Sequence, residues 1–396
     1  MGVSEGLMAS RKGFRKMAGK NIVCCSVTPP PISPMSRIRF EIVPPVRHPA
    51  EDIFISGNVP ALGDWDPSRA LKLNWEPPFH RGEIEAETGF HLEYKIHRGS
   101  WEIEAVTAQG DIPANQVHEV WLDATRHHTV ADWKDRFMGR LMRDRVYSRV
   151  LAGERELLLW LPPAYSMEAT LRFPLIVFHD GPNVFDPATS FSGVDWAADE
   201  WNGLLASEAV MPQAIIAAVI HPEGFTEDNA THRDFDLSPE LGGAAYSQFV
   251  VSELLPHLET HYRTISHPAS RFLIGASLGA LNTFYTALHH PGVFGRYACL
   301  STAFEDVSQR LPEDSLALQA LANEPALPAD IRVYFDHGTL GLDACYGPYH
   351  DRLRELLTQK GWQEGNEFLL RSIEGSGHDE MSWRMRLGEA LRFLAA

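Results

Sequence analysis

The stretch RFLIGASLGA, residues 271–280, decides the fold of the larger part of this chain. Its apolar residues 272–274 predict a buried strand, and the residues from Leu278 onward predict a helix. A Gly-x-Ser-x-Gly pattern lies between them, and its two glycines suit a tight turn with closely packed backbones. We therefore expect the turn to raise Ser277 above the end of the strand. An ordinary glycine-rich turn is the simpler alternative.

Residues 134–396 show the same strand-then-helix pattern on both sides of the turn, since apolar, strand-like stretches alternate with amphipathic, helix-like ones. Such alternation predicts a doubly wound, mostly parallel sheet with helices on both faces. The predicted strands are 155–161, 173–179, 214–220, 272–275, 296–300, 331–335 and 367–372. The predicted helices are 196–207, 244–262, 278–289, 349–360 and 379–395.

Two later loops carry the side chains that a serine nucleophile needs. A hydroxyl attacks only when a base takes its proton. His378 follows the last predicted strand, and Asp343 follows the strand before it, with Asp336 as the alternative acid. Because the carboxyl ends of parallel strands meet at one edge, we expect these groups to converge on Ser277. The backbone N–H of Leu278, at a helix N-terminus, would face a developing oxyanion.

Residues 36–133 have a different pattern, with short strands separated by Gly, Pro, Asn and Asp. This predicts a small all-β sandwich of the Ig-like type. Residues 1–35 are basic and then proline-rich. They are interpreted as a disordered tail or as an over-extended start before Met35, with a degenerate export signal as the third option.

The composition narrows the class of partner. The 35 Lys and Arg against 52 Asp and Glu give a formal net charge of −17, which disfavours nucleic acid and anionic membranes and favours neutral substrates. No apolar run is long enough for a membrane span. Neither a zinc site nor a disulfide framework fits the four cysteines, Cys24, Cys25, Cys299 and Cys345. We expect no cofactor, no metal and a cytoplasmic location, with secretion as the alternative; a homodimer stays open.

Five segments from residue 147 to the C-terminus resemble the putative esterase family of α/β-hydrolases, which includes enterochelin esterase, esterase D, feruloyl esterases and mycolyltransferases. They are HDGPNVFD at 179–186, Trp196, HRDFDLSP at 232–239, ELLPHLE with YRT at 253–264, and GHDEMSW at 377–383. The resemblance implies a triad of Ser277, Asp343 and His378 that works through an acyl-enzyme.

The same resemblance implies further site residues. Asp180, Trp196 and Arg233 would line the substrate pocket. The second oxyanion donor would come from the residue after Asp-Gly, but that residue is Pro182, which has no N–H. Either Asn183 supplies the donor or the hole is weaker.

The N-terminal region resembles family 20 starch-binding modules. The segments that carry the likeness are GNVPALGDWDP at 57–67, HLEYKI at 91–96, GSWE at 99–102 and Asn115. The resemblance implies that Trp65 and Trp101 stack on glucose rings while Lys95 and Asn115 bind hydroxyls of an α-glucan. The alternative is a sandwich kept only for docking, with one tryptophan buried.

The leading hypothesis is therefore a serine carboxylic-ester hydrolase acting on a neutral ester such as an acylated carbohydrate. An acyltransferase of the same fold is the second hypothesis. A carbohydrate-binding scaffold with a weak hydrolase domain is the third, and Pro182 is the feature that suggests it.

Overall fold

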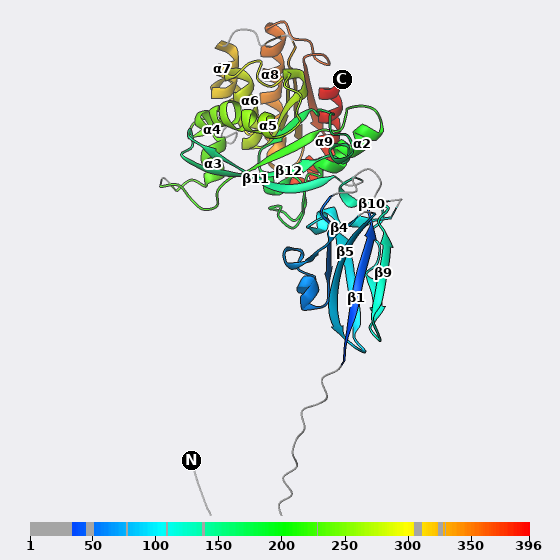
Figure 1. The fold of residues 1–396 in the computed structure, drawn as a ribbon. Helices are drawn as coiled ribbons and strands as arrows, with labels where there is room; N and C mark the ends of the chain where they lie inside the picture. The colour runs from blue at the N-terminus through cyan, green and yellow to red at the C-terminus, as the bar shows by residue number, and fades with distance from the viewer. Residues whose placement is uncertain are drawn as a thin grey trace, which may run out of the picture.

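The computed structural model describes residues 34–44, 51–76, 78–107, 110–136, 139–227, 229–304, 311–323, 328 and 330–396. Most of the predicted tail, including Cys24 and Cys25, lies outside these ranges. Figure 1 shows a β-rich part followed by a larger part built of strands and helices. No helix of the described ranges is long and apolar enough to cross a membrane.

The larger part is built on an eight-stranded sheet of order β11-β12-β14-β13-β15-β16-β17-β18. Only β12 runs against its neighbours, which confirms the prediction of a mostly parallel sheet. The strands are β11 (Arg140–Ser148), β12 (Gly153–Leu161), β13 (Leu175–Phe178), β14 (Ile215–Ile220), β15 (Arg271–Ala276), β16 (Arg296–Leu300), β17 (Arg332–Gly338) and β18 (Phe368–Ile373). Sequence analysis missed β11, an edge strand that lacks a continuous apolar run because it contains the charged residues 143–145.

Helices cover both faces of this sheet (Figure 1). On β15, Leu273 joins one apolar cluster while Phe272 and Ile274 join the other, as the two-residue period of a strand requires. The first cluster includes α4 (Gly243–Phe249), α5 (Leu255–His261), α6 (Leu278–His289), α7 (Leu316–Asn323) and α8 (Gly347–Gln359), and the second α2 (Ala198–Ser207) and α9 (Glu380–Ala395).

Short helical segments complete this part. The predicted helix 244–262 is continuous but passes through a π-helical turn, Val250–Leu254, just before Pro256. Helices α1 (Pro163–Met167) and α3 (His232–Leu237) were not predicted, and neither was α7. All three have eight residues or fewer, too few for a clear helical period.

The N-terminal part is a sandwich of two four-stranded sheets, β4-β5-β1-β9 and β3-β2-β6-β8, with a small β10-β7 pair. Phe40, Tyr94 and Trp133 are buried in its core. The strands are β1 (Met35–Val43), β2 (Phe54–Gly57), β3 (Leu71–Lys72), β4 (Asn74–Glu76), β5 (Phe79–Glu87), β6 (His91–His97), β7 (Ala105–Val106), β8 (Gln116–Glu119), β9 (Ala124–Thr129) and β10 (Asp132–Trp133). Residues 101–106, whose sequence favours a single strand, instead form a 3-10 turn, Trp101–Ile103, followed by β7.

A buried carboxylate, Asp135, links the two parts. One oxygen accepts from Arg98 of the sandwich at 2.5 Å, and the other accepts from Ser166 of α1 at 2.7 Å. Because both bonds use the same side chain, the sandwich is tied to the larger part directly after its last strand.

Candidate active site

The turn after β15 has the strained geometry that the Gly-x-Ser-x-Gly pattern predicts. Ser277 has φ 57° and ψ −122°, a region that residues with a Cβ rarely occupy. A Cβ on Gly275 would lie 2.3 Å from the backbone carbon of Gly279, so strand and helix are in direct backbone contact. The backbone N–H of Ser277 donates to Leu300 on β16 at 2.9 Å, which fixes the turn to the sheet.

A chain of hydrogen bonds connects the three side chains expected to converge. His378 Nε2 lies 2.9 Å from Ser277 Oγ, and His378 Nδ1 lies 2.7 Å from Asp343 Oδ1. His378 lies between β18 and α9, and Asp343 lies in the 3-10 turn after β17. The Asp343 side chain is fully buried, whereas 16% of the His378 side chain is exposed. The imidazole is therefore held by a buried carboxylate on one side, while its other side is accessible to a ligand.

The two candidate acids occupy different positions. Asp343 Oδ2 accepts from Ser301 Oγ at 2.7 Å and from the Gly338 N–H at 2.6 Å. Burial alone would raise the pKa of Asp343, but hydrogen bonds from His378, Ser301 and Gly338 outweigh it and lower that pKa to about 2. Burial raises the pKa of Asp336 to about 6. Within the described ranges no hydrogen bond joins Asp336 to His378, so Asp343 is the better placed acid.

Ser301 and Arg386 support the acid from behind, and sequence analysis missed both. Ser301 Oγ accepts from Trp383 Nε1 at 2.9 Å and from Arg386 at 2.8 Å, so its own proton goes to Asp343. The Arg386 guanidinium also lies 3.3 Å from Asp343 and 3.5 Å from Asp336. A signal existed for Arg386, because it is a charge on the apolar face of the last helix.

The pocket at Ser277 has a volume of about 540 Å³ and is lined by Ser277, His378 and the three predicted pocket residues Asp180, Trp196 and Arg233. Its further lining residues are Pro182, Asn183, Thr189, Phe191, His221, Pro222, Glu380 and Trp383. The structure thus brings the predicted pocket residues to the same place as the nucleophile.

Two of these pocket residues are already paired with each other. Asp180 accepts two bonds from Arg233, at 2.5 and 2.8 Å. Burial would raise the pKa of Asp180, but the charge of Arg233 lowers it, and burial would lower the pKa of Arg233, but Asp180 raises it. Trp196 is 1% exposed and packs edge-on against Trp383 with ring centres 5.9 Å apart. Arg233 is thus largely neutralised, and Trp196 is a rigid wall.

The two predicted oxyanion donors differ in whether their N–H groups already have a hydrogen-bond acceptor within the protein. Leu278 is the first residue of α6, where a backbone N–H has no partner within its helix. The backbone N–H of Asn183 donates to Asp180 O at 2.9 Å and is therefore occupied. The Asn183 side chain accepts from Phe191 N through Oδ1 at 3.0 Å, and this bond leaves Nδ2 as the donor that can serve the pocket.

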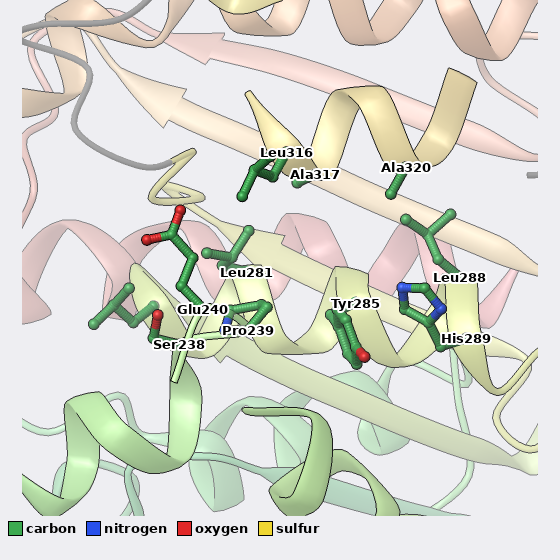
Figure 2. Close-up of a pocket in the computed structure, with 11 residues that line it drawn as sticks. Ser238, Pro239, Glu240, Leu281, Tyr285, Leu288, His289, Leu316, Ala317 and Ala320 are labelled. Carbon is green, nitrogen blue, oxygen red and sulfur yellow. The ribbon is translucent and has the colours of Figure 1, made fainter. Parts of the chain in front are cut away.

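A second cavity, of about 290 Å³, lies along α6 and α7 and is mainly apolar. Figure 2 shows Leu281 and Leu288 on α6 facing Leu316 and Ala320 on α7, and Tyr285 also lines this cavity. Among the described residues that line this cavity, only Leu278 is adjacent to Ser277 in the sequence. Neither Ser277 nor His378 lines the cavity. This cavity is therefore distinct from the pocket at Ser277.

The four residues expected to bind glucan form one shallow hollow on the sandwich, together with Glu104. Trp65 and Trp101 are both half-buried, with ring centres 6.3 Å apart and planes tilted by 45°. Lys95 pairs with Glu104 at 2.8 Å, and Asn115 donates to Glu93 at 2.8 Å. The rings therefore form an angled surface, and neither tryptophan lies in the core.

Across the described ranges, no group of three or more His, Cys, Asp or Glu side chains is arranged to hold a metal ion. Cys299 is fully buried on β16, and burial raises the pKa of its thiol well above the usual range.

Residues 148–394 match the family model described as Putative esterase, and residues 35–123 match the one described as Starch binding domain. A solved ferulic acid esterase is 17% identical, with a TM-score of 0.51, over 65% of this chain and 98% of its own. The ferric enterobactin esterase of Salmonella typhimurium is 15% identical, with a TM-score of 0.50, over 87% of this chain and 88% of its own. These likenesses show the fold alone.

Curated relatives are more similar in sequence over shorter stretches. The uncharacterized protein YbbA of Bacillus subtilis (strain 168) is 27% identical over 161 residues, which are 39% of this chain and 58% of the relative. The uncharacterized protein YjcH of the same organism is 29% identical over 158 residues, which are 40% of this chain and 59% of the relative. The chain thus spans less than two thirds of the length of these relatives.

Proposed function

The chain belongs to the Putative esterase family, and from that premise we propose that it is a serine carboxylic-ester hydrolase with Ser277, His378 and Asp343 as its catalytic triad. The hydrogen-bond chain from Asp343 through His378 to Ser277 is the observation that carries the proposal. It provides a nucleophile, a base and an orienting acid in the roles that acyl transfer requires.

The reaction proceeds in two halves. Ser277 Oγ attacks the ester carbonyl while His378 Nε2 takes its proton, and Asp343 stabilises the imidazolium through Nδ1–H. The imidazolium then protonates the departing alcohol, leaving an acyl group on Ser277. A water molecule, deprotonated by His378, attacks this acyl-enzyme and releases the acid and the free serine.

The negative charge on the attacked carbonyl oxygen needs two donors. The backbone N–H of Leu278 is the first, because it points from the N-terminus of α6. For the second we propose Nδ2 of Asn183, because Pro182 has no N–H and the backbone N–H of Asn183 is bonded to Asp180. The side-chain amide would then replace the missing backbone donor.

The ester that we propose is neutral and carried by a carbohydrate. The charges of Asp180 and Arg233 compensate each other, so this pair does not select an ionic substrate. Trp65, Trp101, Lys95 and Asn115 would hold an α-glucan on the sandwich, where two aromatic rings and flanking polar groups suit the faces and edges of glucose.

Hydrolysis of p-nitrophenyl acetate tests this proposal. Wild-type protein should release nitrophenol, Ser277→Ala should lose at least about 1000-fold in kcat, and the control Ser252→Ala should keep the wild-type rate. Chromatography of the acyl product, with maltose present, should find free acid rather than acyl maltose. Turnover by Ser277→Ala at the wild-type rate would refute the assignment.

A further inference from the structure

Glu380 is a buried carboxylate that the proposed reaction does not use. It is the first residue of α9, two positions after His378, and it lines the catalytic pocket together with Ser277. Only 7% of the residue is exposed. Its side chain therefore meets the pocket rather than bulk water.

The Glu380 carboxylate has no hydrogen-bond or ion-pair partner among the described residues. The other buried carboxylates near the pocket do have partners, since Arg233 binds Asp180, Arg384 binds Asp195, and Ser301 binds Asp343. The Glu380 oxygens are not among the buried polar atoms that lack a partner, so the carboxylate opens onto the pocket, where a bound ligand can reach it.

Helix stabilisation does not explain this placement. A carboxylate in the first turn favours a helix through the macrodipole, and an exposed carboxylate already has this effect. The N-terminus of α9 also has its own cap, because Asp379 accepts from the backbone N–H of Ser382 at 2.9 Å and from its hydroxyl at 3.1 Å. Burial of Glu380 within the pocket thus needs a separate reason.

The surroundings indicate what group the ligand presents. An ionised carboxylate only accepts hydrogen bonds, so the ligand must donate them. The rings of Trp196 and Trp383 line the same pocket, and the Trp383 ring centre lies 5.1 Å from that of His378. Aromatic walls beside an acceptor suit a ring with apolar faces and a hydroxyl-bearing edge. A cationic ligand fits less well, because His378 becomes an imidazolium in this pocket during the reaction.

We propose that Glu380 accepts hydrogen bonds from substrate hydroxyl groups, so that the ester cleaved at Ser277 is part of an uncharged, polyhydroxylated molecule such as a sugar. This inference rests on the proposed function, because it uses the same pocket. It assigns to the pocket a recognition role separate from the glucan hollow of the sandwich.

The test compares two acetate esters, methyl 6-O-acetyl-α-D-glucopyranoside and p-nitrophenyl acetate, which has no hydroxyl group. The readout is the ratio of their kcat/KM values. Glu380→Gln should lower this ratio about 10- to 100-fold, the effect of losing a hydrogen bond to a charged group. The matched control Glu389→Gln removes the same charge from the exposed part of α9 and should leave the ratio unchanged.

An unchanged ratio in Glu380→Gln would overturn the proposal, and so would a failure of the wild type to hydrolyse the sugar ester. Acetylcholine serves as a cationic acetate ester. If Glu380→Gln lowers kcat/KM for acetylcholine but not for the sugar ester, Glu380 binds a cation and the proposal is wrong. If the variant folds poorly, the wild type gives the same answer with the permethylated sugar ester. That analogue should react about 10- to 100-fold more slowly than the hydroxylated one, and equal rates would refute the role. Hydrolysis of p-nitrophenyl acetate by the wild type reports on the proposed function separately.

Discussion

Replacing each of the two buried carboxylates, Asp343 and Asp336, by its amide should have very different effects on kcat. Asp343→Asn removes the acceptor that lies 2.7 Å from His378 Nδ1. The imidazole then loses the partner that fixes its tautomer, and kcat should fall about 10⁴-fold. Asp336→Asn alters a group that no described bond connects to His378, so we expect kcat to change less than about tenfold.

The effect of Asp336→Asn on stability follows from the pKa of Asp336. Burial raises the pKa of Asp336 from an ordinary 3.8 to about 6, so ionising it in the folded protein costs about 3 kcal/mol. Because the folded pKa lies above the unfolded one, this cost is absent below pH 4, grows as the pH rises from 4 to 6, and is complete above pH 6. Asp336→Asn abolishes the ionisation. Relative to wild type it should therefore gain about 2 kcal/mol between pH 4 and pH 7.

Urea unfolding at pH 4.0 and pH 7.0, followed by circular dichroism, measures this difference, and p-nitrophenyl acetate hydrolysis measures kcat. The comparison of two pH values removes any constant effect of the amide on packing. A pH-independent difference between Asp336→Asn and wild type would refute the electrostatic reasoning. A 10⁴-fold loss of kcat in Asp336→Asn, with Asp343→Asn active, would exchange the roles of the two residues.

Three further changes test separate parts of the site. Arg386→Met leaves two buried carboxylates without their shared cation, so the free energy of unfolding in urea should fall by about 3–5 kcal/mol. Asn183→Ala should lower kcat for p-nitrophenyl acetate about 100- to 1000-fold with little change in KM, because it removes an oxyanion donor. Trp65→Ala and Trp101→Ala should each migrate faster than wild type in an amylopectin affinity gel, whereas Trp121→Ala, which removes an exposed tryptophan elsewhere on the sandwich, should not.

Each of these has an outcome that counts against it. Wild-type stability of Arg386→Met would mean that solvent reaches the cluster. A raised KM with unchanged kcat in Asn183→Ala would make that residue a binding group only. Equal mobility of the three tryptophan variants would argue against the glucan hollow.

The parts of the site that were predictable follow from local pattern and chain order. The Gly-x-Ser-x-Gly pattern indicated Ser277. Because the pattern lies between a predicted strand and a predicted helix, it also indicated that the site lies at the carboxyl edge of the sheet. His378 and Asp343 followed because each comes after a strand of a parallel sheet, whose ends share that edge. These inferences needed only the order of the elements.

The parts that were missed depend on register and on side-chain contacts between distant segments. Ser301 reaches Asp343 because Leu300 on β16 is paired with Asp336 on β17, and no local pattern specifies that pairing. The occupied backbone N–H of Asn183 reflects the 3-10 geometry of its turn. Glu380 is visible in the sequence beside His378, but its burial without a partner appears only in the folded protein.

The central claim is that Ser277 is a nucleophile activated by His378, and labelling with a fluorophosphonate tests it most directly. Mass spectrometry of the labelled protein should find one adduct, on the peptide that contains Ser277. Labelling of His378→Ala should be at least about 100-fold slower, because the serine has lost its base. An adduct on another residue, or labelling of His378→Ala at the wild-type rate, would contradict the account.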